Sequence, residues 1–366
     1  MIKLKRYLLV IGTDEFSGAG RITKFFKDSL KKQKIGFLSY LYIGNSSKQK
    51  KQNFKNFQVS KFNKFLNFFK IIFKIFKNKK KIKALYLQEN AGLGKIYDIF
   101  IILIFRIYSK PIFYHNHSSG KYINFDLLTK IIQIISGEKL INIFLSRIES
   151  RKYIYRYGNL EKYYCISNSI FIRKIKASNK KNKSLKTLKF GLISQLTKEK
   201  GFEQFINLAK YSQEKNKKWN FYVAGPIPIN EKYYLNQISK LSNIKYLGVI
   251  DNSQKKILFY SKLNYFIFLS TYFHESEPLV ILEAISNGVI PIVYNRGSIS
   301  ELICSKELII NSKSDPYLAI EKIVEKFNDK NKFKRLYAKS TKNYLNLREK
   351  SKIQFFELIH SIKSIP

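Results

Sequence analysis

Residues 268–302, FLSTYFHESEPLVILEAISNGVIPIVYNRGSISEL, decide how the second half of the chain folds. An apolar run ends at Ser270, and a polar loop leads to Pro278, which suits the first position of a helix because its missing N–H is not needed there. The helix is predicted to end at the Asn-Gly pair 287–288, and a buried strand follows at 290–294. A strand–loop–helix–strand order of this kind is typical of a parallel α/β sheet.

The same alternation runs through the rest of the chain. Strands are expected at 7–11, 35–43, 84–88, 111–115, 162–167, 188–194, 219–224, 244–247, 265–269 and 308–310 as well. Helices are expected at 18–32, 64–78, 96–108, 201–215, 230–242, 253–261, 278–287, 315–327 and 331–366. The pattern predicts two consecutive Rossmann-like α/β domains that face each other across a cleft.

The domain boundaries follow from composition. The stretch 174–187, KIKASNKKNKSLKT, is polar and aperiodic, and it is the best linker candidate. We therefore expect an N-terminal Rossmann-like domain at 1–173 and a C-terminal Rossmann-like domain at 188–343. The remaining residues, 344–366, are expected to form a helix that crosses back to the first domain.

Two carboxylates frame the loop in the decisive stretch. Glu275 lies in the loop, and Glu283 lies about a turn and a half into the helix. The free N–H groups at the start of a helix bind anions such as a diphosphate. Glu283 is placed to bind a ribose diol, so the two carboxylates would hold opposite ends of a nucleotide-sugar.

This spacing resembles the E-x7-E signature of retaining glycosyltransferases of family 4, which have the GT-B fold. Further segments resemble family elements in the same order along nearly the whole chain. These are the Gly-rich loop at 17–21, the strand at 165–167, the loop LTKEKGF at 196–202, the strand FYVAGP at 221–226 and YLG at 246–248.

The resemblance implies that the N-terminal domain binds the acceptor and the C-terminal domain binds the nucleotide-sugar. It also implies roles for individual residues. Glu283 would bind the ribose, Glu275 the hydroxyls of the transferred sugar, and Lys200 the diphosphate. Gly18 would let the backbone approach the phosphates, and His117 would be the histidine near the sugar, with His115 as a competitor. The remaining donor-binding candidates are Gln195, Ser276, Glu277, Pro278, Leu279 and Val280.

One position departs from the family pattern. The family usually has an arginine five positions before the lysine of the donor loop, whereas this chain has Gln195. An amide cannot neutralise a diphosphate, so Lys198 or Arg21 would compensate, or the donor or its affinity would differ. Ser17, beside Gly18, is a second departure.

The expected reaction is glycosyl transfer with retention and without a metal. The chain has no Asp-x-Asp pair to bridge a metal and a diphosphate, so Lys200 and the helix start at 278–280 would stabilise the leaving group. No cofactor is expected, and a UDP-sugar is favoured over a GDP-sugar. The alternatives are a nucleotide-sugar epimerase of the same fold and a non-catalytic protein that binds polyanions or membranes.

The charge of the chain points to an anionic partner. Lys and Arg number 68 against 25 Asp and Glu, which gives a net charge of +43. The excess is mostly lysine and comes with many Ile, Asn, Phe and Tyr residues, so A/T-rich codon usage explains part of it. No motif for specific nucleic-acid binding is present, and an anionic membrane surface is the favoured partner.

Residues 61–83 are the candidate membrane segment. Aromatic and aliphatic side chains recur at helical spacing on one face, at Phe65, Phe68, Phe69, Ile72, Phe73 and Phe76. Lysines occupy another face, at Lys70, Lys74, Lys77 and Lys81. Such a helix suits an anionic leaflet, and the alternative is that its Phe face packs into the domain core.

Localisation and acceptor are inferred from the same features. No apolar stretch reaches the roughly 20 residues needed to span a bilayer, and the run at 7–11 is too short for a signal peptide. Cys165 and Cys304 lack metal-type spacing. We therefore expect a cytoplasmic bacterial enzyme, peripheral on the inner face of the membrane. Its acceptor would be a saccharide or lipid-linked saccharide in surface polysaccharide biosynthesis.

Overall fold

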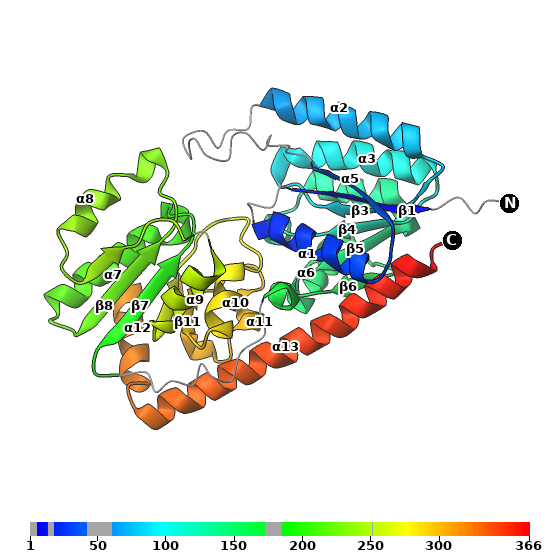
Figure 1. Ribbon diagram of the computed structural model, residues 1–366. Coiled ribbons are helices and arrows are strands. Elements are labelled where there is room, and N and C mark those ends of the chain that lie inside the picture. Colours follow the sequence, from blue (N-terminus) through cyan, green and yellow to red (C-terminus); the bar gives the residue numbers. More distant parts are fainter. Residues whose placement is uncertain (1–5, 14–17, 42–60, 173–184, 251) are drawn as a thin grey trace. The chain divides into compact units, whose positions relative to one another are not determined.

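The structure is a computed structural model that describes residues 6–13, 18–41, 61–172, 185–250 and 252–366. At 41 and 61–64 it describes the backbone alone. The chain divides into two compact units, which are described separately (Figure 1). The first unit comprises Met1–Phe171 together with Lys350–Pro366, and the second comprises Ile172–Glu349.

The first unit is built on a six-stranded parallel sheet of order β2-β1-β3-β4-β5-β6. The strands are β1 (Tyr7–Gly12), β2 (Phe37–Leu41), β3 (Ile82–Gln88), β4 (Ile112–His115), β5 (Leu140–Phe144) and β6 (Tyr163–Cys165). The helices are α1 (Gly18–Lys32), α2 (Lys61–Asn78), α3 (Lys95–Ile107), α4 (Gly120–Ile123), α5 (Leu127–Ser136) and α6 (Arg147–Tyr157).

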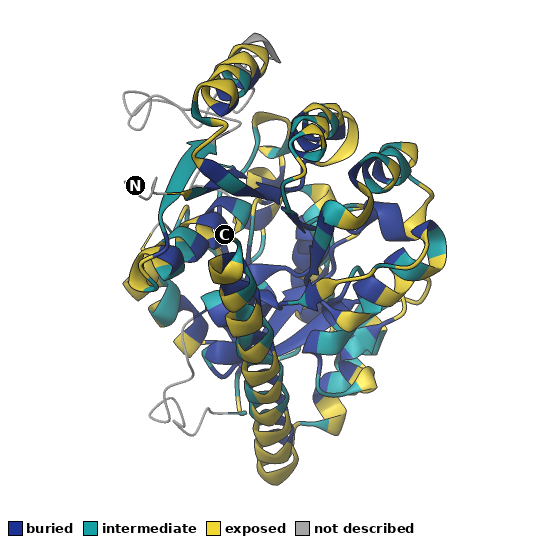
Figure 2. Ribbon diagram, turned by 90° about the vertical axis from the view of Figure 1, so that its right-hand side faces the viewer, coloured by how far each residue is buried: buried dark blue, intermediate teal, exposed yellow. Residues whose placement is uncertain are grey.

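The central strand β1 shows why this sheet is covered on both faces. Successive side chains of a strand point to opposite faces, and β1 is apolar at each position. Leu9 and Ile11 pack in one core with side chains of α2, α3 and α5. Leu8 and Val10 pack in a second core with α1 and with the last turns of α13 (Lys330–Ser364). Figure 2 shows the strands buried and the outer faces of the helices exposed.

The second unit also contains a six-stranded parallel sheet, of order β12-β11-β10-β7-β8-β9. Its strands are β7 (Leu188–Ile193), β8 (Trp219–Ala224), β9 (Ile244–Tyr246), β10 (Tyr265–Phe268), β11 (Ile290–Tyr294) and β12 (Ile309–Ile310). Its helices are α7 (Phe202–Glu214), α8 (Tyr234–Ser239), α9 (Ser253–Ser261), α10 (Leu279–Ser286), α11 (Ile299–Leu302), α12 (Pro316–Lys326) and the first part of α13. Stacked rings of Phe190, Phe221 and Tyr265 fill its centre.

These observations confirm the predicted α/β class with two Rossmann-like sheets. The sequence pattern predicts no helix or strand in the region 116–161, whereas the structure has α4, α5, β5 and α6 there. Pro278, predicted as the first helical residue, is instead the N-cap of α10 with an extended ψ of 123°, so the helix begins one position later, at Leu279. Most of the expected linker, and residues 42–43 of the expected strand 35–43, lie outside the described residues.

The helix predicted to face a membrane divides its aromatic residues between two surfaces. Phe68 is buried with Ile71 and Ile75 in the core of the first unit, so the core-packing alternative holds for part of the face. Phe69 and Phe73 are exposed, the latter by 69%. Lys81 lies beyond the end of α2. No helix among the described residues is long and apolar enough to cross a membrane.

Candidate functional site

The acidic loop, residues 270–278, connects β10 to α10 in the second unit. Glu275 is only 8% exposed there. Its Oε2 accepts a 2.6 Å hydrogen bond from Lys200 Nζ and a 3.2 Å bond from Ser270 Oγ. The Lys200 ammonium also lies 4.0 Å from the ring centre of Tyr272, a cation–π contact. The structure therefore joins two predicted residues, Lys200 and Glu275, in one ion pair.

Backbone contacts fix the conformation of the acidic loop. The N–H groups of Thr271 and Tyr272 both donate to the carbonyl of Glu199, at 2.8 and 3.1 Å. On the other side, Gly297 has φ of +51°, and a Cβ there would lie 2.3 Å from the carbonyl oxygen of Glu275. Only glycine fits such a close approach in this conformation. Ser298 then donates from its N–H and its Oγ to the carbonyl of Ser276.

Glu283 forms a second lysine–glutamate pair, one turn into α10. Lys256 Nζ of α9 donates to both carboxylate oxygens, at 3.0 and 3.1 Å. Tyr260 Oη, from the same helix, donates to Oε2 at 3.2 Å. The pair is largely buried, because the side chains are 23% and 11% exposed. A carboxylate held in this way can accept hydrogen bonds from a diol.

The other predicted residues of this unit have different environments. Ser276 and Glu277 are buried. The charge of Glu277 contributes, after burial, to raising the pKa of Tyr344 in α13 to about 12. Gln195 is exposed on the loop after β7, where its carbonyl accepts from Ser194 Oγ. Pro278, Leu279 and Val280 form the start of α10, where the first N–H groups of the helix have no intrahelical acceptor.

In the first unit, Gln88 links His117 to the first turn of α1, the helix that begins at Gly18. Gly18 is the exposed first residue of α1, and residues 19–21 of the predicted Gly-rich loop lie in the same helix, whereas Ser17 lies outside the described residues. The side chain of Gln88, at the end of β3, donates 2.9 Å to the carbonyl of Ala19 in the first turn of α1. The same Nε2 lies 3.0 Å from His117 Nε2.

The hydrogen bonds of Gln88 determine the tautomer of His117. Gln88 Oε1 accepts from Thr13 N–H, Thr13 Oγ1 and Thr23 Oγ1, at 3.0–3.2 Å. Its Nε2 must therefore be the amide nitrogen, which can only donate. His117 Nε2 accepts that bond, so the proton of the neutral ring is on Nδ1. Burial, assisted by Lys121, lowers the pKa of His117 to about 4 and keeps the ring neutral.

His115, in contrast, is buried and bonded to another core residue. It is buried at the end of β4, and its Nδ1 lies 2.5 Å from Tyr86 Oη. Burial raises the pKa of Tyr86, so the phenol keeps its proton and donates it to His115. Burial also lowers the pKa of His115 well below its usual value. Of the two histidines that the sequence left open, His117 is the more exposed.

A buried charge network holds the loop after β4. Glu89 Oε2 accepts from the N–H groups of His117 and Ser118, at 2.9 and 3.1 Å. Its Oε1 accepts from Lys121 Nζ at 2.6 Å and lies 3.3 Å from Lys95 Nζ. Burial alone would raise the pKa of Glu89, but the two ammonium groups and the hydrogen bonds outweigh it and lower the pKa to about 2. The network thereby fixes the backbone of His117.

Several of these residues were missed by sequence reasoning. Gln88, Glu89, Lys256 and Gly297 carry no motif of their own. Two weak signals were present: the polar pair Gln88-Glu89 ends a buried strand, and Gly297 follows β11 in a loop that starts Asn295-Arg296. Among the described residues, no three His, Cys, Asp or Glu side chains gather into a group that could hold a metal ion.

Comparisons with known proteins place this geometry in a class. The two parallel-sheet units are those of the GT-B fold of glycosyltransferases. Residues 173–343 match the family model of Glycosyl transferases group 1. No match was found among the sequences of curated proteins.

Similar solved structures extend over the whole chain. Sucrose-phosphate synthase from Thermosynechococcus elongatus has a TM-score of 0.70 at 14% identity, with 99% of this chain and 100% of that chain covered. Anabaena Alr3699/HepE, in complex with UDP and glucose, has a TM-score of 0.65 at 15% identity and coverage of 98% and 100%. A trehalose-6-phosphate protein from E. coli, bound with UDP-2-fluoro glucose, has a TM-score of 0.65 at 9% identity and coverage of 98% and 99%. At these identities the likeness supports the fold.

Proposed function

We propose that the protein transfers a sugar from a nucleotide-diphosphate donor to a hydroxyl group of an acceptor. The observation that carries this proposal is the pair of lysine–glutamate contacts, Lys200–Glu275 and Lys256–Glu283, at the start of α10 inside the region that matches the group 1 family model. Two partly exposed cations and two carboxylates at the start of one helix match the chemistry of a nucleotide-sugar, with its diphosphate and its hydroxyls.

Each group has a role in donor binding. Glu283 accepts hydrogen bonds from the ribose diol, and Lys256 holds its carboxylate in position. Glu275 accepts from hydroxyls of the sugar. The diphosphate binds Lys200 and the free N–H groups of Leu279 and Val280, which stabilise the charge that develops on the leaving group. UDP is the favoured nucleotide, since the HepE structures contain UDP and UDP-glucose.

We further propose that transfer retains the anomeric configuration and needs no metal, with the leaving phosphate assisting attack from the same face. His117 contributes a hydrogen bond from Nδ1–H to a sugar hydroxyl, since its Nε2 is occupied by Gln88. The first unit takes the acceptor and the second the donor. Proton NMR of the product checks retention, and activity that survives EDTA checks metal independence. An inverted anomer would overturn the first claim, and activity lost to EDTA but restored by Mg²⁺ would overturn the second.

The acceptor is proposed to be a saccharide or lipid-linked saccharide, as in surface polysaccharide synthesis, reached from the inner face of a membrane. The exposed side of α2 supports this placement. Phe65, Phe69, Phe73 and Phe76 are exposed at spacings of three and four, and Lys70, Lys74 and Lys77 lie beside them. Sedimentation with anionic vesicles tests this, and the Phe69→Ser/Phe73→Ser variant should remain in the supernatant. Equal sedimentation of both proteins would contradict it.

The catalytic proposal is tested by nucleotide release. Wild-type protein with UDP-glucose, UDP-galactose or UDP-N-acetylglucosamine and a panel of saccharide acceptors should release UDP in an acceptor-dependent way. Glu275→Gln should abolish this release. Glu307→Gln, which breaks the exposed pair with Lys326 in the same unit, is the matched control. A changed sugar without acceptor would indicate an epimerase, and no reaction with any donor would contradict the proposal.

A further inference from the structure

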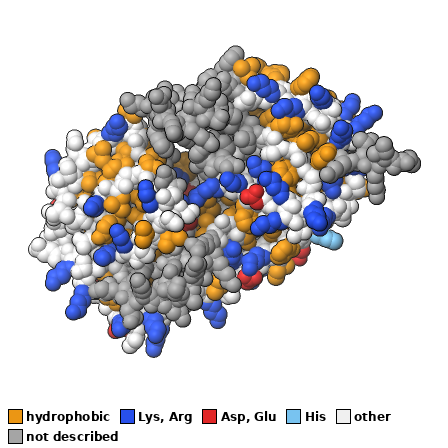
Figure 3. All heavy atoms as spheres, viewed as in Figure 1, with side chains coloured by type: hydrophobic (Ala, Val, Ile, Leu, Met, Phe, Trp, Pro, Cys, Tyr) orange, Lys and Arg blue, Asp and Glu red, His pale blue; other side chains and the backbone are white. Residues whose placement is uncertain are grey.

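The outer face of α3 is apolar throughout its length. Ile96, Phe100, Leu103 and Ile107 recur at spacings of three and four, and each is exposed, Ile107 by 71%. An exposed helix face normally carries polar side chains, and a contiguous apolar one marks a contact surface. Rings of Tyr97 and Phe100 contact Phe68 of α2, so the two helices are neighbours. Figure 3 shows hydrophobic and basic side chains gathered over this part of the first unit.

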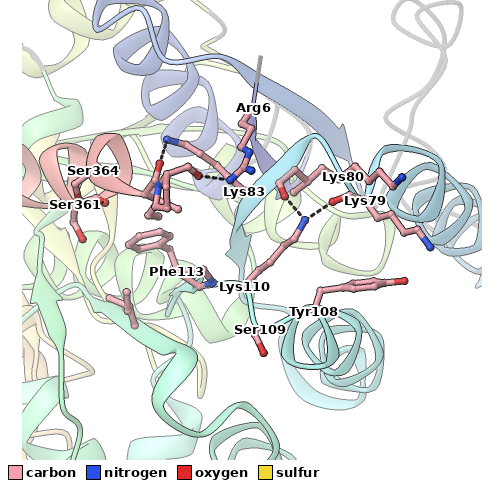
Figure 4. Close-up of a pocket in the computed structure, with 15 residues that line it drawn as sticks. Arg6, Lys79, Lys80, Lys83, Tyr108, Ser109, Lys110, Phe113, Ser361 and Ser364 are labelled. Atoms are coloured by element: carbon pink, nitrogen blue, oxygen red, sulfur yellow. Dashed lines mark hydrogen bonds between the residues drawn. The ribbon is translucent and has the colours of Figure 1, made fainter. Parts of the chain in front are cut away.

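This apolar face ends at a basic pocket. The pocket has a volume of about 950 Å³ and lies at the end of the sheet where β3 and β4 begin (Figure 4). Gln88 and His117 are not among its lining residues. Lys79 and Lys80, directly after α2, line it, and so do Tyr108 and Lys110, directly after α3. The two helices that form the apolar face therefore also lead into the pocket.

The pocket gathers several cationic side chains. None of its fifteen lining residues has an acidic side chain. Burial and the charge of Arg6 lower the pKa of both Lys83 and Lys110. Lys83 Nζ donates 3.0 Å to the carbonyl of Ile365, and Lys110 donates to the carbonyls of Lys79 and Ile82. Arg6 donates 3.0 Å to a terminal oxygen of Pro366, the last residue. Backbone carbonyls thus hold the cations in place, and an added anion would relieve their mutual repulsion.

The residues that line the pocket indicate which kind of ligand it can bind. Pro111, Phe113 and Ile141 give the pocket an apolar side beside its cations. An anion with an apolar part therefore fits better than a free inorganic ion. The exposed apolar faces of α2 and α3 end close in sequence to the pocket, since Phe76 precedes the lining residue Lys79 and Ile107 precedes the lining residue Tyr108. These faces provide a surface for long hydrocarbon chains.

We propose that this pocket binds the phosphate head group of an anionic phospholipid, with the acyl chains beside the outer faces of α2 and α3. The inference rests on the membrane attachment proposed above and deepens it. That attachment used only the exposed apolar and basic side chains of α2, whereas the pocket is a specific site for one lipid head group. It does not depend on the glycosyl transfer itself.

The test measures the chemical accessibility of lysines in the wild-type protein. Lysines are acetylated with a water-soluble reagent and quantified by mass spectrometry, with and without dihexanoyl-phosphatidylglycerol as dispersed monomers. Lys83 and Lys110 should be protected, whereas the exposed Lys32 and Lys152 should react as before. Dihexanoyl-phosphatidylcholine and inorganic phosphate should not protect. Protection by inorganic phosphate alone would assign a soluble ligand and overturn the lipid proposal, as would no protection at all.

A pair of double variants separates the pocket from the general attachment. Arg6→Gln/Lys83→Gln should bind phosphatidylglycerol vesicles roughly 30-fold more weakly than wild type, since each basic residue near an anionic surface contributes about 1 kcal/mol. Lys32→Gln/Lys152→Gln removes the same charge elsewhere in the unit and should bind nearly normally. Equal weakening in both variants would show that net charge alone acts, and would contradict the pocket. If Phe69→Ser/Phe73→Ser leaves vesicle binding intact while the monomeric lipid still protects Lys83, the attachment proposal fails and the pocket stands.

Discussion

Gln88 Nε2 donates a 3.0 Å hydrogen bond to His117 Nε2, and this single contact determines which ring nitrogen of the candidate histidine carries the proton. The amide cannot rotate to reverse the bond, because Thr13 and Thr23 donate to its oxygen and Ala19 accepts from its nitrogen. His117 is thereby a neutral donor through Nδ1. A role as proton acceptor at Nε2 is excluded as long as Gln88 is in place.

Replacing Gln88 by glutamate should reverse this arrangement. A carboxylate at the same position accepts hydrogen bonds and favours the charged imidazolium, so the pKa of His117 should rise from about 4 toward or above its usual value. The chain has four histidines, so NMR titration of the ring resonances resolves them. Gln88→Met, which offers no charge, is the control and should leave the pKa low. An unchanged titration in Gln88→Glu would contradict the assigned contact.

The buried histidines should make folding stability depend on pH in a defined window. His117 and His115 have lowered pKa values in the folded protein, so the unfolded chain binds more protons between about pH 6.5 and 4. Their contribution to stability is complete above pH 6.5 and is lost as the pH falls through that window. Urea unfolding at half-unit steps measures the slope. His117→Asn should reduce it by up to about 1 kcal/mol per pH unit, and an identical slope would contradict the low pKa.

Lys256→Met should leave the Glu283 carboxylate largely buried without its cation. Loss of a partner for a buried charged group costs about 1–3 kcal/mol, so the free energy of unfolding should fall by that amount. Adding Glu283→Gln to the variant should restore part of it, because the unpaired charge is removed. A double-mutant cycle measured by urea unfolding gives the coupling. Strictly additive effects would show that the pair seen at 3.0 Å has no energetic role.

Gly297→Ala should displace the acidic loop. The added Cβ would lie 2.3 Å from the Glu275 carbonyl oxygen, and φ of +51° is unfavourable for alanine. We expect a loss of about 1–3 kcal/mol in unfolding free energy, with UDP binding weakened further than stability alone explains. Gly248→Ala, at a position with φ of +70° and no atom within 4 Å of the added Cβ, controls for backbone strain. Equal effects of both on UDP binding would contradict the steric role of Gly297.

The sequence allowed the two sheets to be predicted because their strands are continuous apolar runs, as buried parallel strands are. The sequence did not allow the strand at 140–144, LINIF, to be predicted, because this apolar run is only five residues long and Asn142 interrupts it. In the structure Asn142 Oδ1 accepts from the Asn116 side chain, a buried polar pair that local periodicity cannot reveal. The sequence analysis also assigned the exposed Phe residues of α2 and the buried Phe68 to one face of the helix. Helical spacing shows that these residues share a broad apolar face, but it does not show which part of that face packs against the sheet.

Some residues of the candidate site could likewise be predicted from the sequence, and others could not. Glu275 and Glu283 were proposed from one contiguous segment whose spacing can be read directly. Their partners Lys200 and Lys256 come from other loops and helices, 75 and 27 positions away. The chain is rich in lysine, so no lysine stands out in the sequence; Lys200 was noticed through its motif and Lys256 was missed. Gln88 was missed because its role depends on three segments that meet only in the folded unit.

The account is tested most directly by thermal unfolding with UDP, GDP, ADP and no ligand, in the wild type and in Glu283→Ala. A nucleotide present at about a hundred times its dissociation constant stabilises the folded state by roughly 2.7 kcal/mol. We predict that UDP raises the unfolding temperature of the wild type and that Glu283→Ala loses this shift while Glu307→Ala keeps it. If no nucleotide shifts the wild type, or if Glu283→Ala shifts as the wild type does, the proposed donor site is contradicted.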